Sequence, residues 1–348
     1  MILPRMAAKT YYCCIAITQP SRLRPSRILL LLFCAGHCVH GAALKGCPCF
    51  FSGKVAPSVL YLQHFGLREA PFGLTPDTGF FFSCREAQQA LNTFVVALST
   101  GAGFVKITGE VGTGKTMLCR KLGAALRAAR WITPYVNQPG LEAQPMMAAI
   151  AEALGVEDAA TLPEHERFKA ISRVLLAHAR AEQRVVLFID ECQAMPLESL
   201  EAVRLLSNVE TEKRKLLQVA LFGQPELDRA LQTEEGRALR QRISFQHRLA
   251  GLDEEEVHAY LGHRLAVAGY SGPPLFGAAG VALLHSASRG APRLVNILAD
   301  KALLLVHGEG GRRVERRHVK AAVRDTPAAA SASWFPRAWF HRSEASRV

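Results

Sequence analysis

The chain has 348 residues, of which 49% are hydrophobic and 21% are charged. These values are ordinary for a globular protein of about two domains and exclude a disordered chain. The formal net charge is +12, but 7 of those charges come from the first 57 residues, which contain no Asp or Glu. The rest of the chain is only mildly basic, so its charge gives little support for nucleic acid as the main partner.

Residues 1–57 form an atypical N-terminal extension. Three arginines precede an apolar run at residues 28–35, and residues 41–43 could serve as a cleavage site, so the segment resembles a signal peptide or a short anchor. The run is too short for a transmembrane helix. Positive charge before it would also direct the following domain out of the cytoplasm, where ATP is absent. Either the extension is not a working signal or it is not part of the natural protein. We favour the second interpretation and expect the true start near Leu60.

The sequence changes character at residue 61. Residues 61–82 are rich in aromatic residues, Pro and Gly, which predicts an irregular segment whose rings pack against the domain. Residues 85–98 are expected to form an amphipathic helix whose apolar face contains Leu91, Phe94, Val95 and Leu98. A buried strand at 103–108 and a helix at 117–130 are predicted next.

Residues 109–116 fit the phosphate-binding loop template G-x-x-x-x-G-K-[ST] at every fixed position. A tight glycine-rich turn lets backbone N–H groups surround phosphate oxygens, and the following helix adds a partial positive charge. We expect Lys115 to reach the β- and γ-phosphates of ATP and the Thr116 hydroxyl to ligate Mg²⁺. The nucleotide-binding residues predicted in this stretch are Gly109, Glu110, Val111, Gly112, Thr113, Gly114, Lys115, Thr116 and Met117.

Strands and helices alternate from residue 131 to residue 249. Strands are predicted at 131–136, 184–190, 216–223 and 243–249, with helices at 143–154, 164–181, 197–208, 225–231 and 234–240. This alternation predicts an α/β fold, namely a three-layer P-loop NTPase domain with a parallel sheet.

Two carboxylates follow the apolar strand at 184–190. At the C-terminal end of a parallel strand, Asp190 would lie beside the phosphate loop. We expect Asp190 to hold Mg²⁺ directly or through water. Glu191 would act as the general base toward the attacking water. An exposed turn after a core strand is the simpler interpretation, but the upstream phosphate loop favours the catalytic one.

No strand is predicted after Gly251. Asp253 and Glu256 form a capping box at the start of a helix with the apolar stripe Val257, Leu261 and Leu265. More helices are expected at 278–288, 292–307 and 314–325. The predicted domains are a P-loop ATPase core at 58–251, a small all-helical domain at 252–326 and a disordered tail at 327–348. The tail's aromatic residues are either incidental or contact a membrane surface or a partner.

These motifs, in this order, resemble the AAA+ ATPases of the ExeA/GspA type, and among them the pilus-biogenesis members most closely. The resemblance covers about residues 60–325. Besides the two nucleotide motifs it rests on segments at 61–72, 222–227 and 290–293. The phosphate loop and acidic pair are common to many ATPases, whereas the opening segment and the Gly-Gln-Pro-Glu-Leu segment are more specific. The resemblance implies that the helical domain is a lid over the nucleotide.

The resemblance also implies roles for several polar residues. Gln224 lies where a sensor-1 residue detects the γ-phosphate, although a Gln before a Pro is also a common turn residue. Arg293 lies where sensor 2 reaches the nucleotide from the lid. Arg240 or Arg242 would be the arginine finger for a neighbouring subunit's ATP, worth about 10³–10⁵ in rate; a solvated helix end explains each arginine equally well. Asn137 would restrain Glu191.

The resulting expectation is a Mg²⁺-dependent ATPase, cytoplasmic or peripheral at the inner membrane. It would form a homo-oligomer with ATP at subunit interfaces and assist inner-membrane proteins that assemble a type IV or MSHA-like pilus or a type II-like secretion system. The alternative is a DNA-associated AAA+ ATPase that helps or regulates transposition. A basic stripe at Arg313, Arg316, Arg317, Lys320 and Arg324 suits it, although a merely solvated face is the favoured interpretation of that stripe. A scaffold that binds ATP without hydrolysis is a third interpretation, and Asp190 and Glu191 argue against it.

Overall fold

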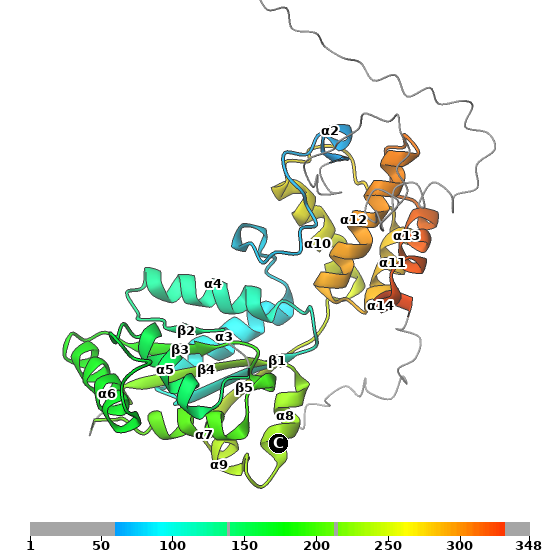
Figure 1. The fold of residues 1–348 in the computed structure, drawn as a ribbon. Coiled ribbons are helices and arrows are strands. Elements are labelled where there is room, and N and C mark those ends of the chain that lie inside the picture. Colours follow the sequence, from blue (N-terminus) through cyan, green and yellow to red (C-terminus); the bar gives the residue numbers. More distant parts are fainter. Residues whose placement is uncertain (1–59, 138–139, 212–214, 331–348) are drawn as a thin grey trace, which may run out of the picture. The chain divides into compact units, whose positions relative to one another are not determined.

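The computed structural model describes residues 60–137, 140–211 and 215–330 (Figure 1). They belong to one unit of the chain, Val55–Val348. The expectations for residues 1–57, and for the predicted tail from residue 331 onward, lie outside the described residues.

A five-stranded parallel sheet forms the centre of the first domain. Its strands follow the order β2-β3-β4-β1-β5, with bounds Tyr135–Val136, Val185–Ile189, Leu217–Gly223, Phe104–Gly109 and Ile243–Leu249. Strands β1, β3 and β4 are buried along their whole length, as expected where helices cover both faces. The predicted parallel α/β sheet is confirmed.

The register of the sheet places three strand ends at one edge. Thr108 in β1 lies opposite Gly223 in β4, and Ile189 in β3 lies opposite Leu221 in β4. The phosphate loop, Asp190 and Gln224 follow directly after these strands, so all three leave the sheet at the same edge. Ligands bind at this edge in open α/β sheets.

Helices cover both faces of the sheet (Figure 1). On one face lie α3 (Arg85–Ser99) and α4 (Lys115–Ala128). The other face packs against α5, α6, α7, α8 and α9, with bounds Ala143–Ala153, Glu164–Arg180, Leu197–Leu206, Pro225–Gln232 and Arg237–Arg242. On the first face the rings of Phe94, Phe188 and Phe222 stack in a row. Burial of each such ring stabilises the fold by about 1.5–3 kcal/mol.

The apolar face predicted for α3 is partly wrong. Phe94 and Leu98 are buried as expected, but Val95 is 61% exposed and Leu91 is only half-buried. The side chains that complete the buried face are Ala87, Ala90 and Ala97. Small residues let the helix approach the sheet closely, whereas the prediction followed the large apolar side chains.

The second domain, called the lid here, contains α10 to α14. Its helices are Glu254–Val267, Ala278–Ser288, Pro292–Gly308, Arg316–Arg324 and Pro327–Ala330. The capping box of Asp253 and Glu256 is confirmed, and the predicted stripe on α10 is buried. Helix α14 forms where disorder was predicted, because Ala329 packs into the lid's hydrophobic cluster.

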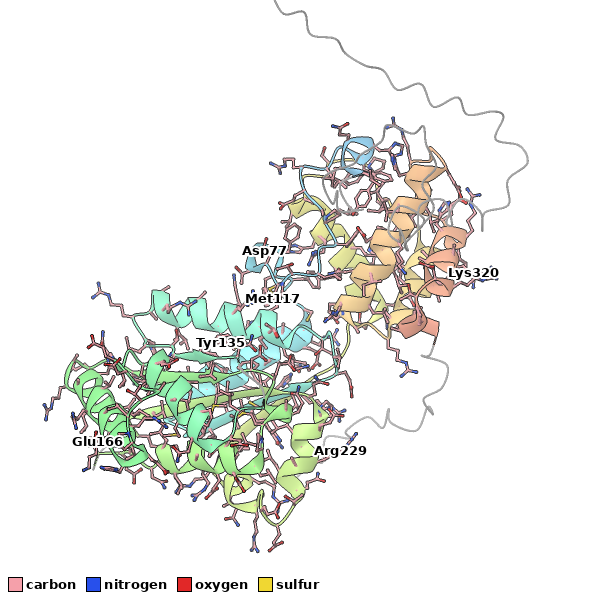
Figure 2. The ribbon with its side chains drawn as sticks, in the orientation of Figure 1. Asp77, Met117, Tyr135, Glu166, Arg229 and Lys320 are labelled. Atoms are coloured by element: carbon pink, nitrogen blue, oxygen red, sulfur yellow. The ribbon has the colours of Figure 1, made fainter. Side chains whose placement is uncertain are left out.

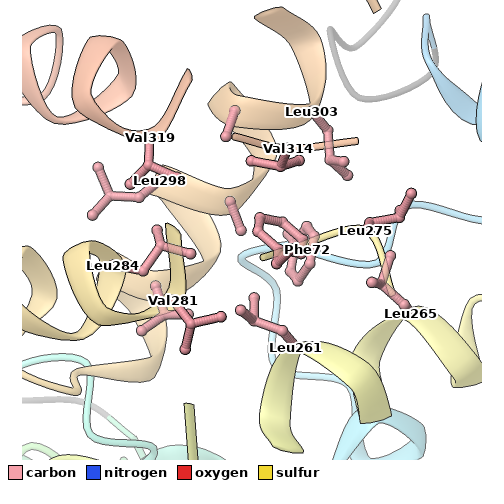
Figure 3. Packing of buried hydrophobic residues seen from close by; sticks show 14 of the residues in the cluster. Phe72, Leu261, Leu265, Leu275, Val281, Leu284, Leu298, Leu303, Val314 and Val319 are labelled. Carbon is pink, nitrogen blue, oxygen red and sulfur yellow. The ribbon is translucent and has the colours of Figure 1, made fainter. Parts of the chain in front are cut away.

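The segment before α3 packs into the lid. It contains the short helices α2 (Leu62–Phe65) and η3 (Thr78–Phe80), and is otherwise irregular, as predicted. The buried rings of Tyr61, Phe65, Phe72 and Phe80 join the lid's hydrophobic cluster, whereas the predicted domain boundary had grouped them with the sheet. Figure 3 shows Phe72 surrounded by lid side chains such as Leu261, Leu298 and Val314. Across the described ranges, no helix has the length and apolarity needed to cross a membrane.

Candidate functional site

The phosphate loop connects β1 to α4 through a turn that requires glycine. Gly112 and Gly114 have φ angles of 81° and 97°, in the left-handed region that glycine adopts without strain. A Cβ on Gly109 would lie 2.9 Å from the carbonyl oxygen of Leu249, so this position excludes a side chain. Helix α4 begins at Lys115, two residues earlier than predicted. Lys115 and Thr116 therefore lie in its first turn.

Lys115 is a buried cation inside the loop. Its Nζ donates to the carbonyl oxygens of Gly109 and Glu110, at 2.8 and 2.9 Å. Burial lowers the pKa of Lys115, and the nearby carboxylates of Glu191 and Asp190 oppose that shift. A buried ammonium whose direct partners are neutral carbonyls is well suited to receive a phosphate.

Asp190 is almost completely buried at the end of β3, with 1% of its surface exposed. Its Oδ1 accepts the backbone N–H of Glu191 at 2.9 Å, and its Oδ2 accepts the hydroxyl of Tyr135 at 3.2 Å. Tyr135, labelled in Figure 2, stands on β2. Burial, and then the charge of Asp190, raise the pKa of Tyr135, so its hydroxyl remains a donor. Sequence inspection did not identify this tyrosine as part of the site.

Glu191 is held in a special conformation by two glutamines. Its φ is 56°, a left-handed value that non-glycine residues rarely adopt and that is often found at functional positions. Its Oε2 accepts the side-chain amides of Gln193 at 2.6 Å and Gln224 at 3.3 Å. The backbone N–H of Gln224 in turn donates to Oε1 of Gln193 at 2.9 Å. The exposed Asn137, predicted to restrain Glu191, is not a partner of this carboxylate among the described residues.

Arg293 joins the lid to the phosphate loop. It lies in the first turn of α12, and its backbone N–H donates to the carbonyl oxygen of Gly112 at 3.1 Å. A Cβ on Gly112 would come within 2.7 Å of the Cβ of Arg293. The lid therefore touches the loop at a point where only glycine fits.

These residues surround a cavity of about 230 Å³. Its loop end is lined by residues 111–117 with Glu191, Gln224 and Arg293. Gly109 and Glu110 contribute the carbonyls that hold Lys115, and Asp190 lies behind the lining. The lid end is lined by residues 73–76 and by the side chains of Phe80, Tyr260, Arg264 and Asn296. Our sequence analysis missed every residue of the lid end.

The donors near the loop end fit Mg²⁺. Thr116 lines the cavity, and each Asp190 oxygen accepts one hydrogen bond and keeps a lone pair. Among the described residues there is no group of three or more His, Cys, Asp or Glu side chains that would form a complete metal site. Mg²⁺ commonly uses one or two protein oxygens together with phosphates and waters. Thr116 and Asp190 therefore suit a cation that arrives with a nucleotide.

Arg240 and Arg242 lie at the opposite edge of the sheet. They end α9, and the next residue, Ile243, pairs with Phe104 at the start of β1. The phosphate loop follows the other end of β1, so neither arginine lines the cavity of its own chain. Gly109, Glu110 and Asp190 do not line the cavity either, but they contact its lining residues Lys115 and Glu191, whereas the two arginines lie at the other edge of the sheet.

Comparison with known proteins agrees with this geometry. Residues 98–231 match the AAA domain family. The general secretion pathway protein A of Aeromonas hydrophila is 36% identical over 264 residues, which cover 76% of this chain and 48% of that protein. The chain thus spans about half the length of the curated relative that it matches.

Solved structures share the fold at low sequence identity. Cdc6p from Pyrobaculum aerophilum has a TM-score of 0.55 and 15% identity, covering 72% of this chain and 71% of that one. The ORC1 protein of Aeropyrum pernix, solved in complex with DNA, has a TM-score of 0.53 and 18% identity, covering 73% and 69%. The chain thus has the AAA+ fold, contains a nucleotide-binding AAA domain and is related to general secretion pathway protein A.

Proposed function

We propose that this AAA-domain protein binds ATP with Mg²⁺ in the cavity between the phosphate loop and the lid, and hydrolyses it. The observation that carries the proposal is the convergence of Lys115, Glu191 and Gln224 on one cavity from three separate strand ends. A buried cation, a carboxylate and an amide at one edge of a sheet are the groups that phosphoryl transfer to water requires.

Each residue has a separate task in this mechanism. Lys115 exchanges its two carbonyl acceptors for phosphate oxygens, and the N–H groups at the start of α4 bind the same phosphates. Glu191 accepts the proton of the attacking water. Gln193 and Gln224 hold that carboxylate in its orientation toward the water, and Gln224 would also detect the γ-phosphate. Mg²⁺ held by Thr116 and Asp190 would neutralise charge on the phosphates.

The position of Arg240 and Arg242 supports catalysis between subunits. Because they lie at the sheet edge opposite the cavity, either arginine could reach only the ATP of another copy. We therefore propose a homo-oligomer with ATP at its interfaces.

The cellular role is proposed from the relative. The 36% identity to general secretion pathway protein A supports a role in assembling a type II-like secretion system, with the ATPase in the cytoplasm at the inner membrane. A type IV/MSHA-like pilus, as for the pilus-biogenesis ATPase MshM, is proposed as the other target on the motif resemblance alone. Replacing the corresponding half of the Aeromonas hydrophila protein with residues 60–330 tests this role. Restored secretion supports it, and failure by a stably produced chimera contradicts it.

Hydrolysis is tested by phosphate release. The wild-type chain should release phosphate from ATP in the presence of Mg²⁺, and Glu191→Gln should lower the rate by about 10²–10⁴-fold while nucleotide still binds. Glu152→Gln is the control, because Glu152 is an exposed carboxylate on α5 that does not line the cavity. Equal rates in wild type and Glu191→Gln would contradict the assignment of the base.

A second function is favoured by one surface. Arg313, Arg316, Lys320 and Arg324 are exposed and lie along one side of the segment that ends in α13. Such a basic face fits the phosphates of duplex DNA, as the transposition-helper alternative requires. ATP-dependent filter binding decides between the two functions. The DNA-binding function is favoured if DNA is retained, if retention falls steeply with salt, and if Lys320→Gln makes that salt dependence less steep. If no DNA is retained, the secretion or pilus function is favoured.

A further inference from the structure

Arg264 of α10 is a buried cation at the lid end of the cavity, with 5% of its surface exposed. Its Nε donates to the carbonyl oxygen of Pro71 at 2.5 Å, and its Nη2 to that of Gly73 at 3.3 Å. Its Nη1 donates to the hydroxyl of Tyr260 at 3.4 Å. Among the described residues all these partners are neutral. The guanidinium thus donates its hydrogen bonds to backbone carbonyls and a hydroxyl rather than to a carboxylate.

The ring of Phe80 completes the surroundings of Arg264. The guanidinium carbon lies 4.4 Å from the centre of that ring, within the range of a cation–π contact. Arginine suits this position because its planar fork donates in several fixed directions while its face stacks on a ring. A lysine has a single charged centre and would not reach all of these partners at once.

Residues 71–76, called the wall segment here, are tied to both domains. Asn296 of α12 donates a second hydrogen bond to the carbonyl oxygen of Gly73, at 3.4 Å, and its Oδ1 accepts the Tyr260 hydroxyl at 2.9 Å. At the other end of the segment, Arg120 of α4 donates to the carbonyl oxygen of Pro76 at 2.9 Å. Gly73, Leu74, Thr75 and Pro76 line the cavity between these attachments.

We propose that Arg264 is a positioning residue that holds the wall segment in place and thereby sets the part of the ATP affinity that comes from the nucleoside. The proposal rests on the proposed nucleotide site. The phosphates occupy the loop end, so the nucleoside faces the lid end, where the wall segment and the rings of Phe80 and Tyr260 lie. Arg264 would not touch the phosphates. Its loss should weaken only ligands that contain a nucleoside.

Arg167 provides a matched control. It is equally buried, at 6% exposure, and it too holds a turn by donating to backbone carbonyls, those of Ala159, Gln144 and Leu162. It belongs to α6, however, and does not line the cavity. Replacing either arginine removes a buried guanidinium that anchors a loop, but only Arg264 adjoins the proposed nucleoside.

The test compares the affinities of Mg²⁺-ATP and Mg²⁺-tripolyphosphate, measured by calorimetry on the full chain. Arg264→Gln should weaken ATP by about tenfold or more, the loss expected when charge-assisted hydrogen bonds are removed, and should change tripolyphosphate by less than about twofold. Arg264→Lys should recover part of the ATP affinity. Arg167→Gln should leave the ratio of the two affinities unchanged. Asn296→Ala, which removes the second hydrogen bond to Gly73, should lower the ratio of ATP affinity to tripolyphosphate affinity by a smaller factor than Arg264→Gln does.

The proposal is overturned if wild type binds both ligands and the ratio of ATP affinity to tripolyphosphate affinity is the same in Arg264→Gln as in wild type. An equal drop for both ligands, or the same change in Arg167→Gln, also overturns it, because the effect would then be general. If Arg264→Gln does not fold, unchanged ratios in Arg264→Lys and Asn296→Ala overturn it. Failure of wild type to bind either ligand would instead remove the proposed function itself, and this inference with it.

Discussion

The two ends of the cavity are built from different kinds of contact. At the loop end, the Lys115 ammonium is held by carbonyls five and six residues away in the same loop. At the lid end, Arg264 and Asn296 hold carbonyls that are 193, 191 and 223 residues away in sequence. The phosphate loop at the loop end is thus a local structure, to which Glu191, Gln224 and Arg293 are added from other segments, whereas the lid end exists only when distant segments are packed together.

This difference has a consequence for how the site can respond to its ligand. The loop end is fixed by β1 and α4, which belong to the sheet domain. The lid end depends on α10 and α12, so a displacement of the lid would move the wall segment at Pro71 and Gly73 while Arg120 of α4 holds it at Pro76. Arg293, which contacts Gly112, is the lid residue that joins the two ends.

The largest expected effect concerns the proposed arginine finger, which neither end of the cavity supplies from its own chain. Replacing both Arg240 and Arg242 by Ala should lower ATP hydrolysis by about 10³-fold, because the transition-state charge loses its arginine. ATP affinity should change little. Mixing this variant with Glu191→Gln subunits should restore phosphate release, since each supplies what the other lacks at a shared interface. No recovery on mixing would contradict a finger that acts between subunits.

The second prediction concerns the contact between Gly112 and Arg293, which joins the two ends of the cavity. Gly112→Ala forces a side chain into left-handed backbone and against Arg293, which should weaken ATP binding by about tenfold. Gly101→Ala is the control, because Gly101 also has a positive φ, 74°, but open space around it. Both variants should lose similar folding stability in denaturant titrations. Equal ATP affinities in the two would show that the contact with Arg293 has no role.

A smaller effect is expected inside the loop end. Gln224→Ala removes one of the two amides that orient the Glu191 carboxylate, so turnover should fall by about tenfold while ATP affinity stays within about twofold. Steady-state phosphate release combined with binding titrations separates the two quantities. A loss of affinity without a loss of turnover would contradict the orienting role.

The smallest effect on nucleotide affinity is expected from a hydrogen bond of the lid that lies outside the cavity. The buried Tyr61 donates a hydrogen bond to Asp300 of α12, and Tyr61→Phe should lower the free energy of unfolding by about 1–3 kcal/mol. ATP affinity should be almost unchanged, because neither residue lines the cavity.

The same pair predicts a pH dependence of stability. Burial raises the pKa of Asp300, although the hydrogen bond from Tyr61 opposes that shift. The folded chain therefore retains a proton that the unfolded chain loses near pH 4, and stability should fall as the pH rises from about 4 through the raised pKa. Asp300→Asn should remove this slope in thermal unfolding measured at several pH values. An identical slope in that variant would contradict the assignment.

The contrast between the two ends also explains what the sequence could predict. The phosphate loop and Asp190 each follow a strand directly, so motif spacing and the parallel sheet were enough to group them, whereas Gln224 was added by the family resemblance. Arg264 and Asn296 belong to no motif, and their contacts with the carbonyls of Pro71 and Gly73 depend on aromatic residues of the first segment packing into the lid. The face of α3 was misjudged for a related reason, because alanines that pack closely on a sheet give a weak apolar signal.

The central claim is that the cavity receives ATP with its phosphates at Lys115, and calorimetric titration of ATP with Mg²⁺ tests it most directly. Lys115→Ala should weaken binding by about 100-fold or more, because the ammonium that contacts two phosphates is lost. Lys121→Ala is the control, since Lys121 lies on the same helix against the ring of Phe81 and does not line the cavity. The account predicts wild-type affinity in Lys121→Ala and a near-complete loss in Lys115→Ala. ATP binding of equal strength in both variants would contradict it.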